Sequence, residues 1–182
     1  MNENHNPWTT VSSKEIYDNP WINLTEHNVI NPNGGKGIYG KVHFKNLAIG
    51  IIPLFENGDT LLVGQYRYPL DAYSWELPEG GGKLDVDPID SAKRELLEET
   101  GLTAKHWTKL LEMHLSNSVS DELSIIYIAE GLTEGESEPE ETEQLQIKRL
   151  PVSEAIDMVM RGEITDSMTV AGLLKFKVLR GN

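Results

Sequence analysis

A short helix whose two ends are both marked in the sequence constrains the fold of this chain more than any other segment. Asp87 can cap its N-terminus, Pro88 suits the first helical position, and Gly101 suits the position after the last turn. Asp90 lies in the first turn, where the helix dipole favours negative charge. These residues predict a helix over residues 88–100.

Three glutamates, Glu95, Glu98 and Glu99, occupy the last turns of this helix, where each acid costs about 0.3–1 kcal/mol against the dipole. At about 100° per residue, Ala92 and Leu96 define an apolar sector. Glu99 lies within about 40° of the centre line of that sector and Glu95 lies at its edge, so burial adds to the cost. A divalent cation reverses these terms, and Mg²⁺ takes carboxylate oxygens as ligands. We interpret the three acids as a metal site; a solvated acidic face is the alternative.

The remaining segments indicate a sheet flanked by helices. An Asn-Gly turn at 57–58 separates two aliphatic runs and is typical of a β-hairpin. The order of strands, helix, strands and terminal helices predicts an α/β fold with a mixed sheet that carries helices on its faces. The expected strands are 46–55, 60–68, 107–115 and 122–131, and the expected terminal helices are 152–161 and 166–179. Residues 1–45 are polar and turn-rich, with two or three strands, and are too few to fold alone.

Composition excludes several classes of function. Sixteen Lys and Arg against twenty-nine Asp and Glu give a net charge of −13, which disfavours nucleic acid polymers and anionic membranes as partners. The chain has no cysteine, so disulfides, thiolate catalysis and sulfur-ligated metals are excluded. Its most apolar stretch is far shorter than the roughly 20 residues that span a bilayer. We expect a cytoplasmic protein whose ligand is a small molecule; an anionic ligand is compatible with the charge if metal ions screen the repulsion.

Residues 80–102, "GGGKLDVDPIDSAKRELLEETGL", resemble the signature of the Nudix hydrolases, G-x5-E-x7-R-E-U-x-E-E-x-G-U, where U is a bulky aliphatic residue. Eight of the nine fixed positions match, namely Gly80, Arg94, Glu95, Leu96, Glu98, Glu99, Gly101 and Leu102. The ninth position, the first glutamate of the family, falls on Val86, between Asp85 and Asp87. In the family this acid mainly supports the arginine, so the departure bears on how Arg94 is oriented, and a neighbouring aspartate is the candidate replacement.

The resemblance extends over most of the chain. Residues 64–81, "GQYRYPLDAYSWELPEGG", are similar to the segment before the motif in the ADP-ribose and nucleoside diphosphate sugar pyrophosphatase branch. Residues 18–44 look like the added β-domain of that branch, which relatives exchange between the subunits of a dimer. The resemblance implies an α/β/α sandwich around a mixed sheet, with a small N-terminal β-domain over residues 1–45 and a Nudix hydrolase domain over residues 46–182. It also implies a homodimer.

The implied activity is Mg²⁺-dependent hydrolysis of the pyrophosphate bond of nucleoside diphosphate sugars, such as ADP-ribose, GDP-mannose and ADP-glucose, to a nucleoside monophosphate and a sugar phosphate. Mn²⁺ is a possible substitute. Glu95, Glu98 and Glu99 would hold two or three ions, with a backbone carbonyl of Glu79 or Gly80 as a further ligand. The alternative for the glycines at 80–82 is a flexible turn. Within the motif, the resemblance implies structural roles for Arg94 and Gly101.

A catalytic base is expected in the acidic segment "EGESEPEETEQL", residues 134–145, because relatives place a glutamate on a loop after the motif. Glu141 and Glu143 match the E-x-E ending of that loop and Glu140 is adjacent. One of the three is predicted to be the base or an extra metal ligand; a disordered acidic linker is the alternative.

The resemblance also implies residues that bind substrate. Arg67, in "QYRYP", would grip the pyrophosphate or the sugar phosphate, and Glu76, in "WELPEG", is a second candidate; for Arg67 the alternative is a surface salt bridge. Trp21 and Tyr39 match positions where relatives place aromatic rings around the base, although either can belong to a core or a dimer interface. A non-catalytic nucleotide sensor is the alternative function, and Val86 is its only support.

Overall fold

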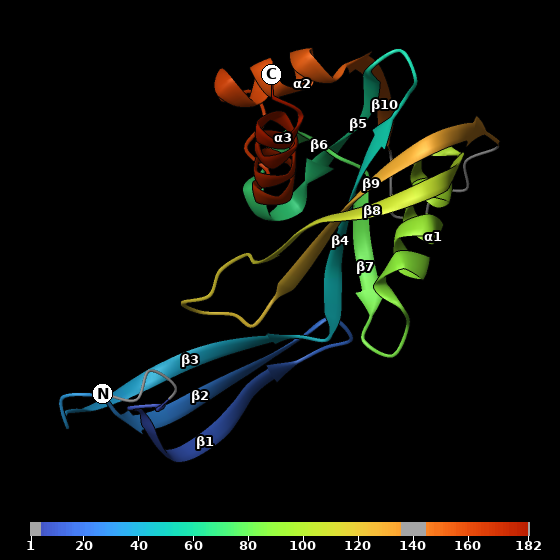
Figure 1. Ribbon diagram of the computed structural model, residues 1–182. Helices are drawn as coiled ribbons and strands as arrows, with labels where there is room; N and C mark the ends of the chain where they lie inside the picture. The colour runs from blue at the N-terminus through green and yellow to red at the C-terminus, as the bar shows by residue number, and fades with distance from the viewer. Residues whose placement is uncertain (1–4, 136–144, 182) are drawn as a thin grey trace. The chain divides into compact units, whose positions relative to one another are not determined.

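A computed structural model of the chain describes residues 5–135 and 145–181 (Figure 1). The residues form two compact units, which we describe separately. The N-terminal unit holds the residues up to Asn46 together with Ser116–Glu122, and the larger unit holds Leu47–Leu115 and the residues from Leu123 onward.

The N-terminal unit is built on a three-stranded antiparallel sheet of β1 (Thr9–Asp18), β2 (Ile22–Ile30) and β3 (Lys36–Phe44), with β2 in the centre (Figure 1). The turn between β2 and β3 places Gly34 at a φ of 84°, a backbone conformation that glycine adopts without strain. The side chain of Asn31 stabilises this turn by accepting hydrogen bonds from the backbone N–H groups of Asn33 and Gly35. The predicted N-terminal β-structure is therefore confirmed as three strands.

Residues 116–122, which connect two strands of the larger unit, lie along the free edge of β3. The backbone N–H of Val42 donates to the carbonyl of Val119 over 2.9 Å, and the N–H of Asp121 donates to the carbonyl of Val42 over 3.2 Å. Val42 and Ser120 form a parallel bridge. The sequence did not indicate this fourth segment of the N-terminal unit.

The larger unit contains two sheets and the helices that cover them. Its elements are β4 (Asn46–Leu54), β5 (Asp59–Arg67), a 3-10 turn (Tyr68–Leu70), β6 (Ala72–Glu76), β7 (Glu79–Lys83), α1 (Pro88–Thr100), β8 (Leu102–His114), β9 (Leu123–Glu134), β10 (Gln146–Pro151), α2 (Val152–Met160) and α3 (Ser167–Arg180). One sheet has the order β7-β4-β9-β8, in which β4 and β9 are parallel while β8 and β9 are antiparallel, so the predicted mixed sheet is confirmed. The other sheet has the order β10-β5-β6 and is antiparallel.

Alternating residues of β4 and β9 supply two separate hydrophobic cores. Ile49, Ile125 and Tyr127 pack in one cluster with Ala92 and Leu96 of α1. The intervening positions of these strands pack in a second cluster with α2 and α3; its members include Ile52, Ile126, Ile128, Ile156, Leu173 and Phe176. Because successive side chains of a strand point to opposite faces, this division places α1 on one face of the sheet and α2 and α3 on the other. The predicted α/β/α arrangement is confirmed.

Short strands account for most of the differences from the sequence prediction. The sequence did not indicate β6, β7 or β10, and β8 begins at Leu102 instead of residue 107. β7 has the sequence Glu-Gly-Gly-Gly-Lys, which local propensity assigns to a turn, but pairing with β4 holds it extended. Among the described residues, no helix combines the length and the apolar character that a membrane crossing requires.

Candidate active site

Helix α1 carries the three glutamates, and its observed ends are the predicted ones. The side chain of Asp87 accepts a hydrogen bond from the N–H of Ile89 over 3.1 Å, and Gly101 follows the last turn with a φ of 71°. Ala92 and Leu96 are fully buried, and the same side of the helix carries Glu95 and Glu99 into the interior with them. Only 7% of Glu95 and 2% of Glu99 is exposed. Apolar packing by α1 therefore compels two carboxylates to be buried, which is costly unless positive charge or donors compensate.

Arg94 supplies part of that compensation. Its guanidinium forms ion pairs with Glu95 and with Glu98, and it donates to the carbonyl of Gly81 over 2.8 Å. These contacts orient Arg94 although Val86 stands where the expected motif has an acid. Asp87 is occupied as the helix cap. The carbonyl of Gly81, together with two acids of the helix, does what a neighbouring aspartate was expected to do.

The segment before the motif approaches these acids through its backbone. The N–H of Glu79 donates to Oε2 of Glu99 over 2.9 Å. A Cβ atom added at Gly80 would lie 2.2 Å from the carboxyl carbon of Glu95, so no larger residue fits there without displacing that carboxylate. Gly80 does not have a positive φ, so its backbone conformation is open to other residues. Space, not backbone conformation, requires glycine at this position.

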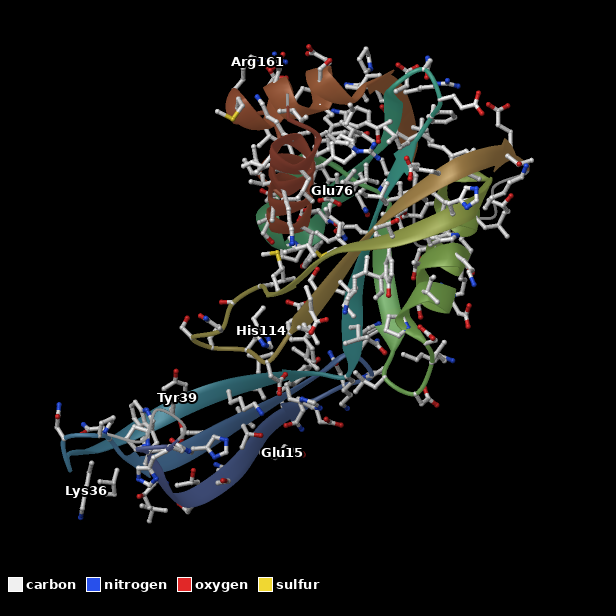
Figure 2. All side chains as sticks on the ribbon, viewed as in Figure 1. Glu15, Lys36, Tyr39, Glu76, His114 and Arg161 are labelled. Carbon is white, nitrogen blue, oxygen red and sulfur yellow. The ribbon has the colours of Figure 1, made fainter. Side chains whose placement is uncertain are left out.

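Arg67, at the end of β5, lies in a second group of charges. Nε of Arg67 donates to both carboxylate oxygens of Glu76 over 3.0 Å each, and Nη2 pairs with Glu79 over 2.7 Å. Glu76, labelled in Figure 2, is the last residue of β6 and is buried. The predicted substrate residues Arg67 and Glu76 are thus brought together, and Glu79 joins them through its side chain, while its backbone N–H donates to Glu99.

Glu79 is the most unfavourably placed acid among the described residues of this group. Burial, and then the nearby carboxylates of Asp166 and Glu76, raise the pKa of Glu79 well above its ordinary value. Its Oε2 atom is buried and has no hydrogen-bond partner within the described part of the chain. A buried carboxylate oxygen without a donor fits a site that receives a cation or a donor from a ligand.

Asp166 belongs to this group and was missed by the sequence reasoning. It caps α3 by accepting from the N–H of Thr169 over 2.7 Å, and carboxylate oxygens of Glu76, Glu79 and Asp166 lie within 4.8 Å of one another. An open pocket of about 340 Å³ is lined by Arg67, Glu76, Glu79 and Asp166, with Pro69, Leu70, Ser74, Thr165 and Ser167. An aspartate before a helical stretch marks a cap in the sequence, but it does not reveal which residues lie across from it.

The aromatic residues predicted to surround a base are far apart on the N-terminal sheet. Tyr39 lies in the middle of β3 (Figure 2), opposite His27 in the strand register. Trp21 comes just before β2 and is 65% exposed; six positions separate it from His27, or roughly 20 Å of extended strand. Within one N-terminal unit these two rings cannot enclose one base.

Trp8 is the aromatic residue that lies beside Tyr39. Their ring centroids are 5.5 Å apart in an edge-to-face arrangement. The two rings help to line a pocket of about 340 Å³, together with Asn6, Thr10, His27, Val29 and Lys41. Trp8 gave no signal in the sequence beyond its residue type. The proposed bases Glu140, Glu141 and Glu143 lie outside the described residues, so their role stays a prediction.

Residues 44–168 match the family model of the NUDIX domain, and residues 8–42 match that of the nucleoside diphosphate sugar hydrolase N-terminal domain. The chain belongs to the Nudix family. The helix α1 with its acids, and the segment of Gly80 that approaches them, are therefore the Nudix motif, and this chain is a Nudix pyrophosphatase of the nucleoside diphosphate sugar hydrolase class.

Similar proteins differ in the sugar nucleotide they are named for. An ADP-ribose pyrophosphatase of Mycobacterium tuberculosis is 36% identical over 171 residues, which is 91% of this chain and 81% of the relative. A GDP-mannose pyrophosphatase of Yersinia enterocolitica is 32% identical over 135 residues, 69% of each chain. A solved structure of an ADP compounds hydrolase, 20% identical, has a TM-score of 0.85 over 96% of this chain and 95% of its own, which shows that the fold is shared.

Proposed function

We propose that this Nudix pyrophosphatase hydrolyses the pyrophosphate bond of nucleoside diphosphate sugars of the ADP-ribose, GDP-mannose and ADP-glucose type. The products are a nucleoside monophosphate and a sugar phosphate. The observation that carries this proposal is the pair of buried acids, Glu95 and Glu99, beside the backbone of Glu79 and Gly80. Relatives named for ADP-ribose and for GDP-mannose support the breadth of the proposed substrate class.

The donor set fits Mg²⁺, with Mn²⁺ as a substitute. Glu95, Glu98 and Glu99 offer hard carboxylate oxygens on adjacent turns. Because Gly80 has no side chain, the backbone lies close enough to these acids to add a carbonyl from Glu79 or Gly80 as a ligand. When bound, such cations neutralise phosphate charge and make bound water a better nucleophile. Without them, the net charge of −13 would repel a pyrophosphate.

Two arginines orient the acidic side chains of the site. Arg94 orients Glu95 and Glu98 through two ion pairs and a bond to the Gly81 carbonyl. Arg67 and Glu76 are our proposed substrate residues. Since Arg67 pairs with Glu76 and Glu79, a phosphate of the substrate would share the guanidinium with them, while the carboxylates can accept hydrogen bonds from sugar hydroxyls.

We assign the catalytic base to one of Glu140, Glu141 and Glu143. A carboxylate that ligates a cation is a poor proton acceptor, so the acids of α1 are unsuited to this role. A glutamate on a separate segment can approach the attacking water once the substrate has bound. We further propose that the protein is a homodimer that exchanges the N-terminal β-domain, residues 1–45, and that Tyr39 and Trp21 contact the base.

A panel of nucleotide sugars tests the proposal. The purified chain is incubated with ADP-ribose, GDP-mannose and ADP-glucose in Mg²⁺, with and without a phosphatase that acts on the monoester products. Inorganic phosphate should appear only when both enzymes are present, because the reaction itself yields two phosphate monoesters. If no substrate gives phosphate, the result would favour a non-catalytic nucleotide sensor, the alternative suggested by Val86 in place of the first glutamate of the motif.

A further inference from the structure

We propose that Asp121 is a positioning residue for the base of the nucleotide: it anchors residues 116–122 to β3 and thereby holds Tyr39 and Lys41 in place in the N-terminal pocket. The inference rests on the proposed function and names a residue that acts through others without touching the ligand. Each contact on which it depends lies within the N-terminal unit.

Asp121 binds β3 at three points. Its carboxylate accepts a hydrogen bond from the backbone N–H of Phe44 over 3.0 Å, and it lies 2.8 Å from both Nζ of Lys41 and Nδ1 of His43. Burial opposes ionisation, but the bonds from Lys41, His43 and Phe44 outweigh it and lower the pKa of Asp121 below its ordinary value. The carboxylate is therefore ionised at neutral pH and joins neighbouring positions of one strand.

The anchored segment reaches Tyr39. The hydroxyl of Tyr39 donates to the carbonyl of Ser118 over 2.6 Å, three residues before Asp121. The backbone between them is attached to Val42 at Val119 and at Asp121. A tyrosine ring has one rotatable bond to Cβ and one to the ring, so a bond at its hydroxyl, with Trp8 against its edge, restrains both. The position of the Ser118 carbonyl, and with it the Tyr39 ring, depends on the anchor.

The Asp121 carboxylate also balances the positive charge of Lys41. Residues 39, 41 and 43 of β3 lie on the same face of the sheet, because successive side chains of a strand point to opposite faces. Tyr39 and Lys41 both line the N-terminal pocket. The ammonium group of Lys41 is paired with Asp121. Loss of the acid would leave this cation without its pair and would loosen the ring beside it. A planar heteroaromatic base stacks well on a fixed tyrosine ring, because less freedom is lost when the ligand binds.

The test measures binding of AMP and of ribose 5-phosphate to the full chain by titration calorimetry, so it does not depend on turnover. Asp121→Asn keeps an acceptor for Phe44 but removes the charge that holds Lys41 and His43. We expect a Kd for AMP about tenfold higher, as for the loss of a charged hydrogen bond, and an unchanged Kd for ribose 5-phosphate. In substrate hydrolysis, KM should rise while kcat stays within twofold.

Two further variants locate the effect. Tyr39→Phe removes the bond to Ser118 and keeps the ring, so it should weaken AMP binding in the same direction. The double variant Asp121→Asn/Tyr39→Phe should have a Kd for AMP no higher than that of the more strongly affected single variant, because both substitutions disrupt the same chain of contacts. The matched control is Asp18→Asn, which breaks an exposed ion pair with Lys45 in the same unit and should leave both affinities unchanged.

Several results would overturn the inference: an Asp121→Asn protein that binds AMP as the wild type does, equal losses for AMP and ribose 5-phosphate, additive effects in the double variant, or a wild type that does not bind AMP. Should Asp121→Asn not fold, an AMP affinity of Tyr39→Phe equal to that of the wild type would overturn it too. A wild type that binds AMP but hydrolyses no nucleotide sugar would defeat the proposed function, while the affinities would still decide the role of Asp121.

Discussion

Glu99 shows how a single residue can be unfavourable for folding and suited to catalysis. Its side chain is 2% exposed, it lies at the negative end of α1, and Glu95 is one turn away. The N–H of Glu79 donates to its carboxylate. Burial of two carboxylates one turn apart is costly, and a cation at this site would offset that cost.

The first prediction concerns Glu99→Gln. Turnover of nucleotide sugars in Mg²⁺ should fall by several orders of magnitude, because the amide keeps the shape of the side chain but not its charge. The thermal unfolding midpoint in a chelator should not fall, since a buried like charge is removed, and the rise on adding Mg²⁺ should shrink. Phosphate release and differential scanning fluorimetry measure these outcomes. Glu112→Gln on β8, an exposed acid paired with Lys109, is the control. Near-normal turnover by folded Glu99→Gln protein would remove the metal assignment.

The second prediction concerns Gly80→Ala. The new methyl group would overlap the carboxyl group of Glu95, so either the carboxylate or the backbone of β7 has to move. We expect kcat to fall at least tenfold and the free energy of unfolding to fall by about 1–3 kcal/mol, the usual cost of overpacking. Gly40→Ala on β3 is the control, because a methyl group there meets no atom within 4 Å. Unchanged activity of Gly80→Ala would show that the close approach to Glu95 has no catalytic importance.

At the scale of elements, α1 and the acidic segment after β9 divide the proposed chemistry between them. α1 has a capped start, a glycine after its end, and an apolar stripe that packs on β4 and β9. It is a rigid support, which suits groups that must hold cations in place. A base that has to approach and leave the attacking water is better placed on a separate segment.

The third prediction tests that division. When Glu140, Glu141 and Glu143 are changed singly to Gln, one variant should show kcat reduced by roughly 10²–10⁴ while its affinities for Mg²⁺ and substrate change little. Steady-state kinetics and Mg²⁺ titrations separate the cases. A variant that loses Mg²⁺ affinity would identify a ligand. If all three variants keep the wild-type kcat, the base lies in the Nudix motif, with Glu98 the next candidate.

At the scale of the whole molecule, the N-terminal unit is not a continuous stretch of chain. Residues 116–122 come from the connection between β8 and β9 and bind the edge of β3. Many of its large apolar side chains are exposed, including Val11, Ile16, Tyr17, Trp21 and Ile38. Such exposure on a small sheet is typical of an interaction surface.

The fourth prediction is that deletion of residues 1–40 abolishes the dimer. The deletion removes β1, β2 and the first half of β3, so it takes away the strands that we propose to pair with the partner subunit. Size-exclusion chromatography with light scattering should show a dimer for the full chain, and monomer or aggregate for the shortened one. Asp18→Asn, which leaves the strands intact, should remain dimeric. A soluble, active monomer after the deletion would contradict the prediction.

The sequence by itself determined the features that are local. The cap at Asp87, the glycine at 101 and the apolar positions at Ala92 and Leu96 were enough to define α1 and to bury Glu95 and Glu99. Backbone propensity, capping and helical periodicity act over a few residues, so a single segment contains the information. The mixed sheet with helices on both faces followed from the order of such segments.

Only the tertiary structure decided which distant groups meet. Asp166 faces Glu79 and Glu76 because α3 and β6 pack in one unit, and no local pattern ties an N-cap to acids more than eighty residues earlier. The same holds for the segment of Asp121 on β3 and for Trp8, in place of Trp21, beside Tyr39. The physical reason is that packing and strand pairing are set by the complementarity of whole surfaces, which the order of residues along one segment does not encode.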